Sequence, residues 1–284
     1  MKKYISMLAE LGKIRITVMV AFTTATGYIL AEGGSVVQLL LTVLGVFMLA
    51  CGSSAMNHYQ ERDLDVLMDR TKNRPIPSGR ITPPAVLTLT IGMWLAGSVI
   101  IILSSNLTAL ILGFLAVIWY NVIYTPMKRK TALAVLPGAL IGSIPPAIGW
   151  SAGGGSVTDP GIISLALFFF IWQIPHFWLL LLLFEKDYRK AGVPTLTSYI
   201  SPEMISRMTF LWLVSLAVSG LLFFTSGLIR TPYAFLLILI LGVYMIWNSR
   251  SLFRPGRMSY RSVFKQVNIY VMLIIIILSV NRYF

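Results

Sequence analysis

Long apolar runs recur along the whole chain, and they constrain the fold more than any other feature. A run of about 20 apolar residues can cross the roughly 30 Å hydrocarbon layer of a bilayer as an α-helix. Hydrophobic residues make up 57% of the 284 positions and charged residues only 12%. We therefore predict an all-α polytopic membrane protein with nine spans. They lie at about 14–32, 36–56, 84–104, 107–125, 132–151, 161–183, 206–228, 231–248 and 266–283.

The fifth of these runs is the weakest, because Pro137, Pro145 and Pro146 interrupt it. Proline removes a backbone donor, so it is tolerated in a spanning helix only where neighbouring segments satisfy the freed carbonyl groups. No repeat, low-complexity tract or long linker divides the chain. We expect residues 1–284 to form one membrane-embedded domain.

Basic residues are distributed unevenly between the two sides of the predicted bundle. With the N-terminus inside, the inner segments are the N-terminal residues and about 57–83, 126–131, 184–205 and 249–265. Together with the adjoining helix ends they hold 21 of the 23 Lys and Arg residues. The positive-inside rule then predicts a cytoplasmic N-terminus, an outer C-terminus and a multi-pass protein of the cell (inner) membrane. A basic rim beside anionic lipid accounts for the pI near 10.0, so we expect no nucleic-acid partner.

The segment from Asn57 to Arg80, NHYQERDLDVLMDRTKNRPIPSGR, holds four of the ten acidic residues. Asn57, Glu61 and Asp65 are spaced four residues apart, so on an α-helix that continues the second span they form one stripe. Amide and carboxylate oxygens are hard ligands, and Mg²⁺ takes one or two protein carboxylates alongside water and phosphate. The stripe predicts a metal site. The alternative is a solvated loop in which acids and bases neutralise one another.

Basic residues follow this stripe directly and recur in two other inner loops. RTKNRP contains Arg70 and Arg74, and the planar fork of arginine matches phosphate oxygens. YTPMKRKT places Lys128 and Arg129 in one short loop, for which a simple positive-inside anchor is the alternative. FEKDYRKAGVPTL adds Asp187 among further charges. Acids gathered into two loops on one face favour a bound cation, and with the basic residues they indicate a metal-bridged phosphate site.

The sixth span contains the motif WQIPHFW, with Gln173 and His176 on either side of Pro175. Polar residues at this depth in a membrane usually face the interior of the bundle and are candidates for function. A histidine between tryptophans in an apolar cavity can position a planar metallated macrocycle. The alternative is a histidine that is hydrogen-bonded to the carbonyl group freed by the proline.

These motifs, in their order and spacing, resemble those of the protoheme IX farnesyltransferases (heme O synthases), a branch of the UbiA superfamily of intramembrane prenyltransferases. The resemblance rests on NHYQERDLD…MDRTKNRPIPSGRI, YTPMKRKT, GSIPPAIGW, WQIPHFW and DYRKAGVPTL. It implies a nine-helix bundle around a central cavity, with the prenyl diphosphate at the cytoplasmic mouth. It also implies farnesyl diphosphate and heme b as substrates, Mg²⁺ as cofactor, and hand-over of the product to a heme A synthase or a terminal oxidase assembly.

The resemblance assigns roles to the matching positions of this chain. The catalytic and metal-binding residues that it implies are Asn57, Glu61 and Asp65. The implied diphosphate-binding residues are Arg70, Arg74, Lys128 and Arg129; Asp187 and Tyr188 match a second motif, and His176 is the heme-side candidate.

Two departures from the wider superfamily bear on the acceptor. The second stripe position, usually Asp, is Glu61, which keeps the charge. Quinone-type members place several aspartates ahead of the second motif, whereas this chain has Leu179 and Leu183 there. That loss favours the heme branch over a prenyltransferase with an aromatic or quinone-precursor acceptor. A transporter of anionic lipid or phosphate compounds is a further alternative, but the matched broken helices typical of inverted halves are absent from the sequence pattern.

Overall fold

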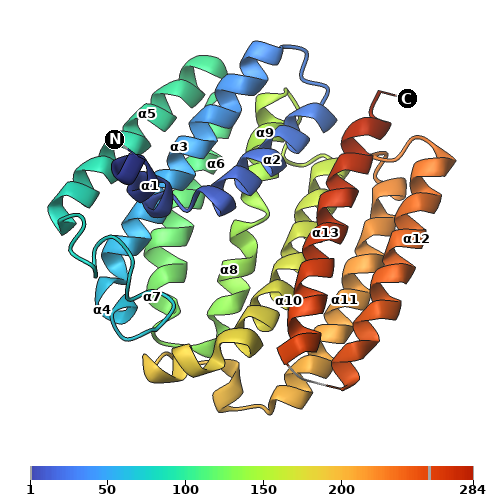
Figure 1. The fold of residues 1–284 in the computed structure, drawn as a ribbon. Coiled ribbons are helices and arrows are strands. Elements are labelled where there is room, and N and C mark those ends of the chain that lie inside the picture. The colour runs from blue at the N-terminus through green and yellow to red at the C-terminus, as the bar shows by residue number, and fades with distance from the viewer. Residues whose placement is uncertain (1, 255–256, 284) are drawn as a thin grey trace.

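The computed structural model describes residues 2–254 and 257–283, and in those residues every regular element is a helix (Figure 1). The α-helices are α1 (Lys2–Leu11), α2 (Ile14–Leu30), α3 (Val36–Gln60), α4 (Arg62–Asp65), α5 (Pro83–Ser104), α6 (Leu107–Ile118), α7 (Thr125–Met127), α8 (Val135–Ile141), α9 (Ile144–Ala152), α10 (Pro160–Lys190), α11 (Pro202–Thr225), α12 (Pro232–Ser249) and α13 (Arg257–Asn281). Tighter or wider helical turns are η1 (Trp119–Tyr124), η2 (Ala132–Ala134), η3 (Leu196–Ser198) and η4 (Arg250–Phe253).

Eight of the nine predicted spans are helical segments of at least 18 residues that are apolar enough to cross a membrane. The remaining span is α2, an apolar helix of 17 residues that is slightly short by the same measure. The prediction of an all-α polytopic membrane protein is therefore confirmed, with nine as an approximate count of its spans.

The fifth span is interrupted where the sequence indicated weakness. Between Ala132 and Ala152 the chain forms η2, α8 and α9, and the α-helix breaks at Gly142 and Ser143 before a new one begins at Ile144. In α10, by contrast, the helix continues through Pro175, and its backbone departs from helical geometry at Phe184 (φ −121°, ψ 21°). The neighbours of α10 include α8, α9, α11 and α13, which surround it with packing partners.

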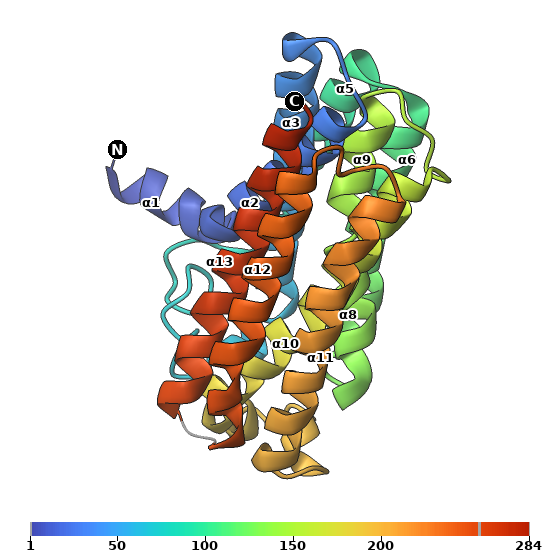
Figure 2. The same ribbon diagram turned by 90° about the vertical axis from the view of Figure 1, so that its right-hand side faces the viewer.

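The spans form a closed ring. Going round it, α2 packs on α3, α3 on α5 and α6, α6 on α9, and α8 and α9 on α10. The ring continues with α10 on α11 and α13, α11 on α12, and α12 on α13. Because α13 also contacts α2, the first and last spans lie side by side (Figures 1 and 2).

Two glycines allow α2 and α9 to approach each other unusually closely. A Cβ atom at Gly27 would lie 1.9 Å from the carbonyl oxygen of Pro146, and one at Gly149 would lie 1.8 Å from that of Thr24. Both clashes are with backbone atoms, which side-chain rotation cannot relieve. Small residues at such crossings are typical of helix pairs in membranes, where close van der Waals packing drives association.

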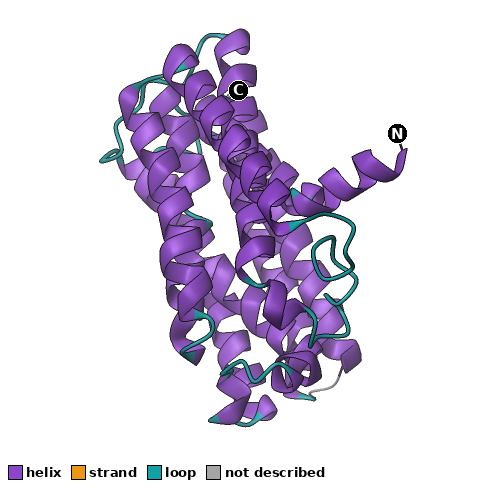
Figure 3. Cartoon of the chain, turned by 90° about the vertical axis from the view of Figure 1, so that its left-hand side faces the viewer, coloured by secondary structure: helices purple, strands orange, loops and turns teal. Residues whose placement is uncertain are grey.

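The segments that follow α3, α7, α10 and α12 lie at the same end of the bundle, the lower end in Figure 1, whereas the C-terminus lies at the opposite end. The short helix α1 projects sideways from the bundle (Figure 2), and the long loop that follows α4 lies next to it (Figure 3). An ion pair between Arg80 and Glu10, 2.8 Å apart, joins this loop to α1. The loops predicted to form a site are thus gathered at one end of the molecule.

Candidate functional site

The predicted stripe of Asn57, Glu61 and Asp65 is buried at the end of α3. It is not one continuous helix, because α3 ends at Gln60 and α4 begins at Arg62. The backbone N–H of Glu61 still donates to the carbonyl of Asn57 (2.9 Å), and that of Asp65 donates to the carbonyl of Glu61 (2.8 Å). The four-residue periodicity therefore survives the break, and the three side chains lie on successive turns.

Each carboxylate of the stripe faces a basic side chain from another segment. Arg74 Nη1 lies 2.8 Å and 2.9 Å from the two carboxylate oxygens of Asp65. Lys128 Nζ lies 2.5 Å from Glu61 Oε1. The structure thus brings Arg74, from the loop after α4, and Lys128, from the turn after α7, to the acids that the sequence placed in the same site.

The amide of Asn57 has partners from two further segments. Lys13, in the turn between α1 and α2, donates from Nζ to Asn57 Oδ1 (2.7 Å). Asn57 Nδ2 donates to Thr125 Oγ1 (3.3 Å), and that hydroxyl donates to the carbonyl of Tyr120 (2.9 Å). Sequence reasoning assigned Lys13 only to the basic inner side and did not identify Thr125. Thr125 lies within the motif YTPMKRKT, but only the charges of that motif were assigned to the site, and nothing in the sequence near Lys13 indicates a partner 44 positions away.

The electrostatics of the cluster follow from burial and from these pairs. Burial alone would raise the pKa of Glu61, but Lys128 and Lys13 outweigh burial and hold that pKa below its ordinary value. Correspondingly, burial would lower the pKa of Lys128, but the attraction of Glu61 raises it. Burial raises the pKa of Asp65 despite Arg74. Burial, and then repulsion from Arg74, lower the pKa of Lys13 to about 7.

The two acidic loops contact each other directly. Lys190, at the end of α10, forms an ion pair and hydrogen bond with Asp69 of the loop after α4. Met68 packs with Val193 in a small buried apolar cluster, against which Tyr188 also lies. The second predicted loop is therefore held against the first.

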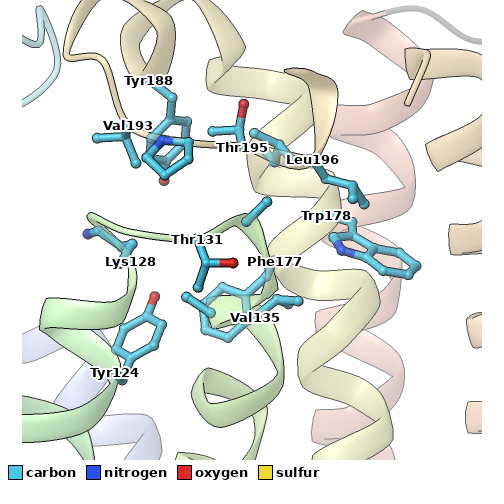
Figure 4. Close-up of a pocket in the computed structure, with 14 residues that line it drawn as sticks. Tyr124, Lys128, Thr131, Val135, Phe177, Trp178, Tyr188, Val193, Thr195 and Leu196 are labelled. Carbon is cyan, nitrogen blue, oxygen red and sulfur yellow. The ribbon is translucent and has the colours of Figure 1, made fainter. Parts of the chain in front are cut away.

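A cavity of about 90 Å³ opens beside Lys128 at this end of the bundle. Lys128 and Tyr188 lie on opposite sides of it, and Tyr124 and Phe177 form its apolar wall (Figure 4). The predicted second-motif residue Tyr188 thus faces Lys128 across the cavity (Figure 4). The half-buried Asp187 forms no salt bridge with any residue in the described ranges.

The two other predicted phosphate-binding arginines lie at the rim. Arg129 pairs with Asp63, with Nη2 2.7 Å from Oδ1, and also donates to the carbonyl of Gln60. Arg70 is exposed and its guanidinium lies 5.1 Å from the centre of the Phe184 ring. The structure therefore holds Arg129 next to the stripe and Arg70 further out.

His176 lies in α10 and pairs with a residue that sequence reasoning did not identify. Its Nδ1 is 3.0 Å from Oδ1 of Asn268 in α13. Its ring contacts the aromatic rings of Trp172, Phe177 and Phe264 at centroid distances of 5.1, 5.8 and 4.9 Å. Nδ1 is thus engaged across the helix interface and is not bonded to the carbonyl freed by the proline in α10.

No group of three or more His, Cys, Asp or Glu side chains suited to a metal ion occurs within residues 2–254 and 257–283. The oxygen donors of the stripe are two carboxylates and one amide. This set is sparse by the standard of a protein-only metal cage, but it matches an ion that takes its remaining ligands from water and phosphate.

Residues 20–273 match the sequence model of the UbiA prenyltransferase family. A protoheme IX farnesyltransferase of Geobacter sulfurreducens is 39% identical over 78% of this chain and 81% of its own length. A protein of the same name from Gloeobacter violaceus is 34% identical over 97% of this chain and 91% of its own length.

The fold is similar to those of solved membrane proteins of low sequence identity. A digeranylgeranylglyceryl phosphate synthase superimposes with a TM-score of 0.80 over 99% of both chains, at 17% identity. A UbiA homolog from Archaeoglobus fulgidus, bound to DMAPP and Mg²⁺, gives a TM-score of 0.73 over 97% of this chain and 99% of its own, at 16% identity.

Proposed function

The chain belongs to the UbiA prenyltransferase family, and from this premise we propose that it transfers the farnesyl group of farnesyl diphosphate to heme b, forming heme O and releasing diphosphate. The names of its similar relatives support this activity. The structural observation that supports it best is the buried cluster at the end of α3, in which carboxylates and an amide alternate with basic side chains from three other segments.

We propose that Asn57, Glu61 and Asp65 hold Mg²⁺ together with the diphosphate of the donor. Their oxygen atoms are the ligand type that Mg²⁺ prefers, and all three side chains are buried on successive turns. The Mg²⁺-bound homolog from Archaeoglobus fulgidus supports the use of a divalent ion in this fold. When bound, the ion would neutralise negative charge that develops on the departing diphosphate.

Basic side chains of this chain complete the stabilisation of the leaving group. Arg74, Lys128 and Arg129 each lie against an acid of the same loops, so they are held in place before the anion arrives. Their donors form charge-assisted hydrogen bonds to phosphate oxygens, which are about twice as strong as neutral ones. Because Arg70 lies further out on Phe184, we assign it to the rim, where it attracts the diphosphate.

An aromatic wall leads from this cluster into the bundle. The ring centroids of Tyr120 and Tyr124 are 5.7 Å apart, those of Tyr124 and Phe177 are 6.1 Å apart, and Phe177 is followed by His176 at 5.8 Å. Departure of diphosphate from a primary allylic carbon leaves a carbocation, and aromatic faces attract cations most strongly where water is excluded. We propose that this wall shields the cation until the electron-rich vinyl group of the heme attacks it, after which water supplies the hydroxyl group.

The second loop and the sixth span contribute the acceptor side in this proposal. Tyr188 borders the cavity opposite Lys128, Asp187 precedes it in the chain, and His176 lies at the inner end of the aromatic wall. The leucines at positions 179 and 183, where quinone-type enzymes place aspartates, support heme over a quinone precursor as the acceptor.

Heme extraction tests this function directly. The full chain is produced in a bacterial host that makes heme b but no heme O, and the membranes are extracted and analysed by chromatography and mass spectrometry. Heme O is expected with the wild-type chain and not with Asp65→Asn at an equal membrane level. Appearance of a prenylated quinone precursor with no change in heme would favour the alternative acceptor and contradict the proposal.

We also propose that residues 1–284 act as one domain of the cell membrane, with the site on the cytoplasmic side, the C-terminus outside, and the product passed to a heme A synthase or oxidase assembly. The gathering of the basic loops at one end of the bundle supports this orientation (Figure 1). A single cysteine introduced at exposed Lys130, on a background in which Cys51 is serine, should react with an impermeant thiol reagent only from the cytoplasmic side.

A further inference from the structure

His176 and Asn268 form the only polar pair described between α10 and α13, and its geometry determines the protonation of the imidazole. Asn268 Nδ2 donates to the backbone carbonyl of Phe264, one turn earlier in α13 (2.6 Å). A carbonyl oxygen can only accept a hydrogen bond, so the amide atom facing it must be the nitrogen. Asn268 Oδ1 is therefore the atom that faces His176 Nδ1, at 3.0 Å.

This amide orientation leaves one consistent arrangement of protons. An amide oxygen cannot donate, so Nδ1 of His176 must carry the hydrogen and donate it to Asn268. In the neutral imidazole, Nε2 then has a free lone pair. Among the described residues Nε2 has no hydrogen-bond partner, and it is not one of the fully buried polar atoms without partners. His176 thus presents a lone pair that no described residue engages, within a largely apolar span.

The surroundings of His176 suit a flat apolar ligand that carries a metal. Trp172, Phe177 and Phe264 surround the imidazole with aromatic surface. A histidine that ligates a metal commonly donates its other ring N–H to a carbonyl or carboxylate oxygen, which fixes its tautomer and orientation. The His176–Asn268 pair has this arrangement, with the amide oxygen as the acceptor.

We propose that Asn268 is a positioning residue that holds His176 in the Nδ1–H form, so that Nε2 ligates the iron of the heme acceptor. The inference rests on the proposed function, because it takes heme as the substrate. Ligation would anchor the porphyrin next to Phe177, the residue through which the aromatic wall continues to Tyr124 and the diphosphate cluster. Ligation would also bring the reacting vinyl group of the heme to the end of the bundle at which the farnesyl donor binds in the proposed function.

The test titrates the full-length chain in detergent with ferric heme b and records the absorption spectrum. The chain has only two histidines, and the other, His58, is fully buried in α3. The wild type is expected to show the spectrum of imidazole-ligated heme, and His176→Gly to lose it and regain it on addition of free imidazole. His58→Ala is expected to keep the wild-type spectrum.

Variants of Asn268 separate positioning from packing. Asn268→Leu removes the acceptor and should weaken heme binding about 10-fold or more, the effect usual for a lost partner of a metal-bound histidine. Asn268→Asp keeps an acceptor oxygen and should keep the ligated spectrum. Asn248→Leu is the matched control, because half-buried Asn248 also donates to the carbonyl four residues earlier, that of Tyr244, but has no hydrogen bond with a histidine.

Two results would overturn the inference: a His176→Gly spectrum equal to that of the wild type, or Asn268→Leu binding heme as Asn248→Leu does. Each variant is first checked for binding of a farnesyl diphosphate analogue in the presence of Mg²⁺, which a folded chain should retain. A wild type that shows the ligated spectrum but makes no heme O would contradict the proposed function and leave the ligation supported. If heme O is formed but substitution of His176 leaves the heme spectrum unchanged, the ligation is contradicted and the proposed function remains supported.

Discussion

The substitution Arg74→Ala tests the charge balance of the site, because it leaves a buried carboxylate without its partner. Asp65 is 1% exposed, and the side chain of Arg74 is 17% exposed. Breaking a buried ion pair by removing one member typically costs about 3–5 kcal/mol. The pKa of Asp65 is already raised by burial, so this carboxylate can take up a proton and reduce the cost. We therefore expect a loss of about 3 kcal/mol, or roughly 6–12 °C in melting temperature.

The same reasoning predicts that a second substitution restores stability without restoring function. Asp65→Asn in the Arg74→Ala background removes the unpaired charge, so the two losses should not add, and a coupling of at least about 1 kcal/mol is expected. Turnover should remain absent in the double variant, because it lacks both the carboxylate proposed to hold Mg²⁺ and the guanidinium proposed to bind the diphosphate. Stability and activity are thereby separated at one pair of residues.

A thiol-reactive fluorophore provides the assay, because Cys51 is the only cysteine and is buried in the folded chain. The control is Lys72→Ala, which removes an exposed partner of Asp69 and should change stability by less than about 1 kcal/mol. The reasoning is wrong if Arg74→Ala has the same melting temperature as the wild type. It is also wrong if Asp65→Asn lowers the melting temperature of the Arg74→Ala variant by as much as it lowers that of the wild type.

Three further predictions follow from the packing and the pairs. Gly149→Ala should destabilise the chain by about 1–3 kcal/mol or more, because its Cβ would meet a backbone carbonyl, whereas Gly92→Ala, with open space around it, should melt no lower than the wild type. Lys128→Met should raise the Michaelis constant for farnesyl diphosphate about 10-fold or more and leave that for heme unchanged; an effect on heme alone would contradict its role. Asp63→Asn should keep near-normal turnover, since this side chain is 63% exposed, lies outside the stripe and keeps an oxygen that accepts from Arg129; loss of turnover would show that its charge is needed at the site.

The sequence predicted the spans well because each depends on local composition. A run of apolar residues must form a helix in a bilayer, where no water can satisfy its backbone groups. For the same reason the proline-rich fifth span could be identified as the irregular one, and it breaks near Gly142. The helix break at Glu61 was missed, because the four-residue spacing of the stripe indicates a regular helix and the termination depends on packing around the residue.

The chain by itself determined which chemical groups are available and at which end of the bundle they gather (Figure 1). Spacing along one helix end grouped the acids, and the unequal loop charges grouped Lys128 and Arg74 with them. The apolar run around His176 also showed that this residue lies within a span. These properties depend on neighbours in sequence, so pattern and composition are sufficient to reveal them.

Only the tertiary structure decided which groups meet. The contacts of Lys13 with Asn57 and of His176 with Asn268 join residues 44 and 92 positions apart. Neither partner carries a local signal, since a lysine at a helix start and an asparagine in a span are each compatible with many environments. Their pairing follows from the closure of the helical ring, in which the contacts of α2 with α3 and of α10 with α13 bring distant turns to the same depth. A polar group in an apolar surrounding is stable only where such a partner lies opposite it, and the folded bundle selects that partner.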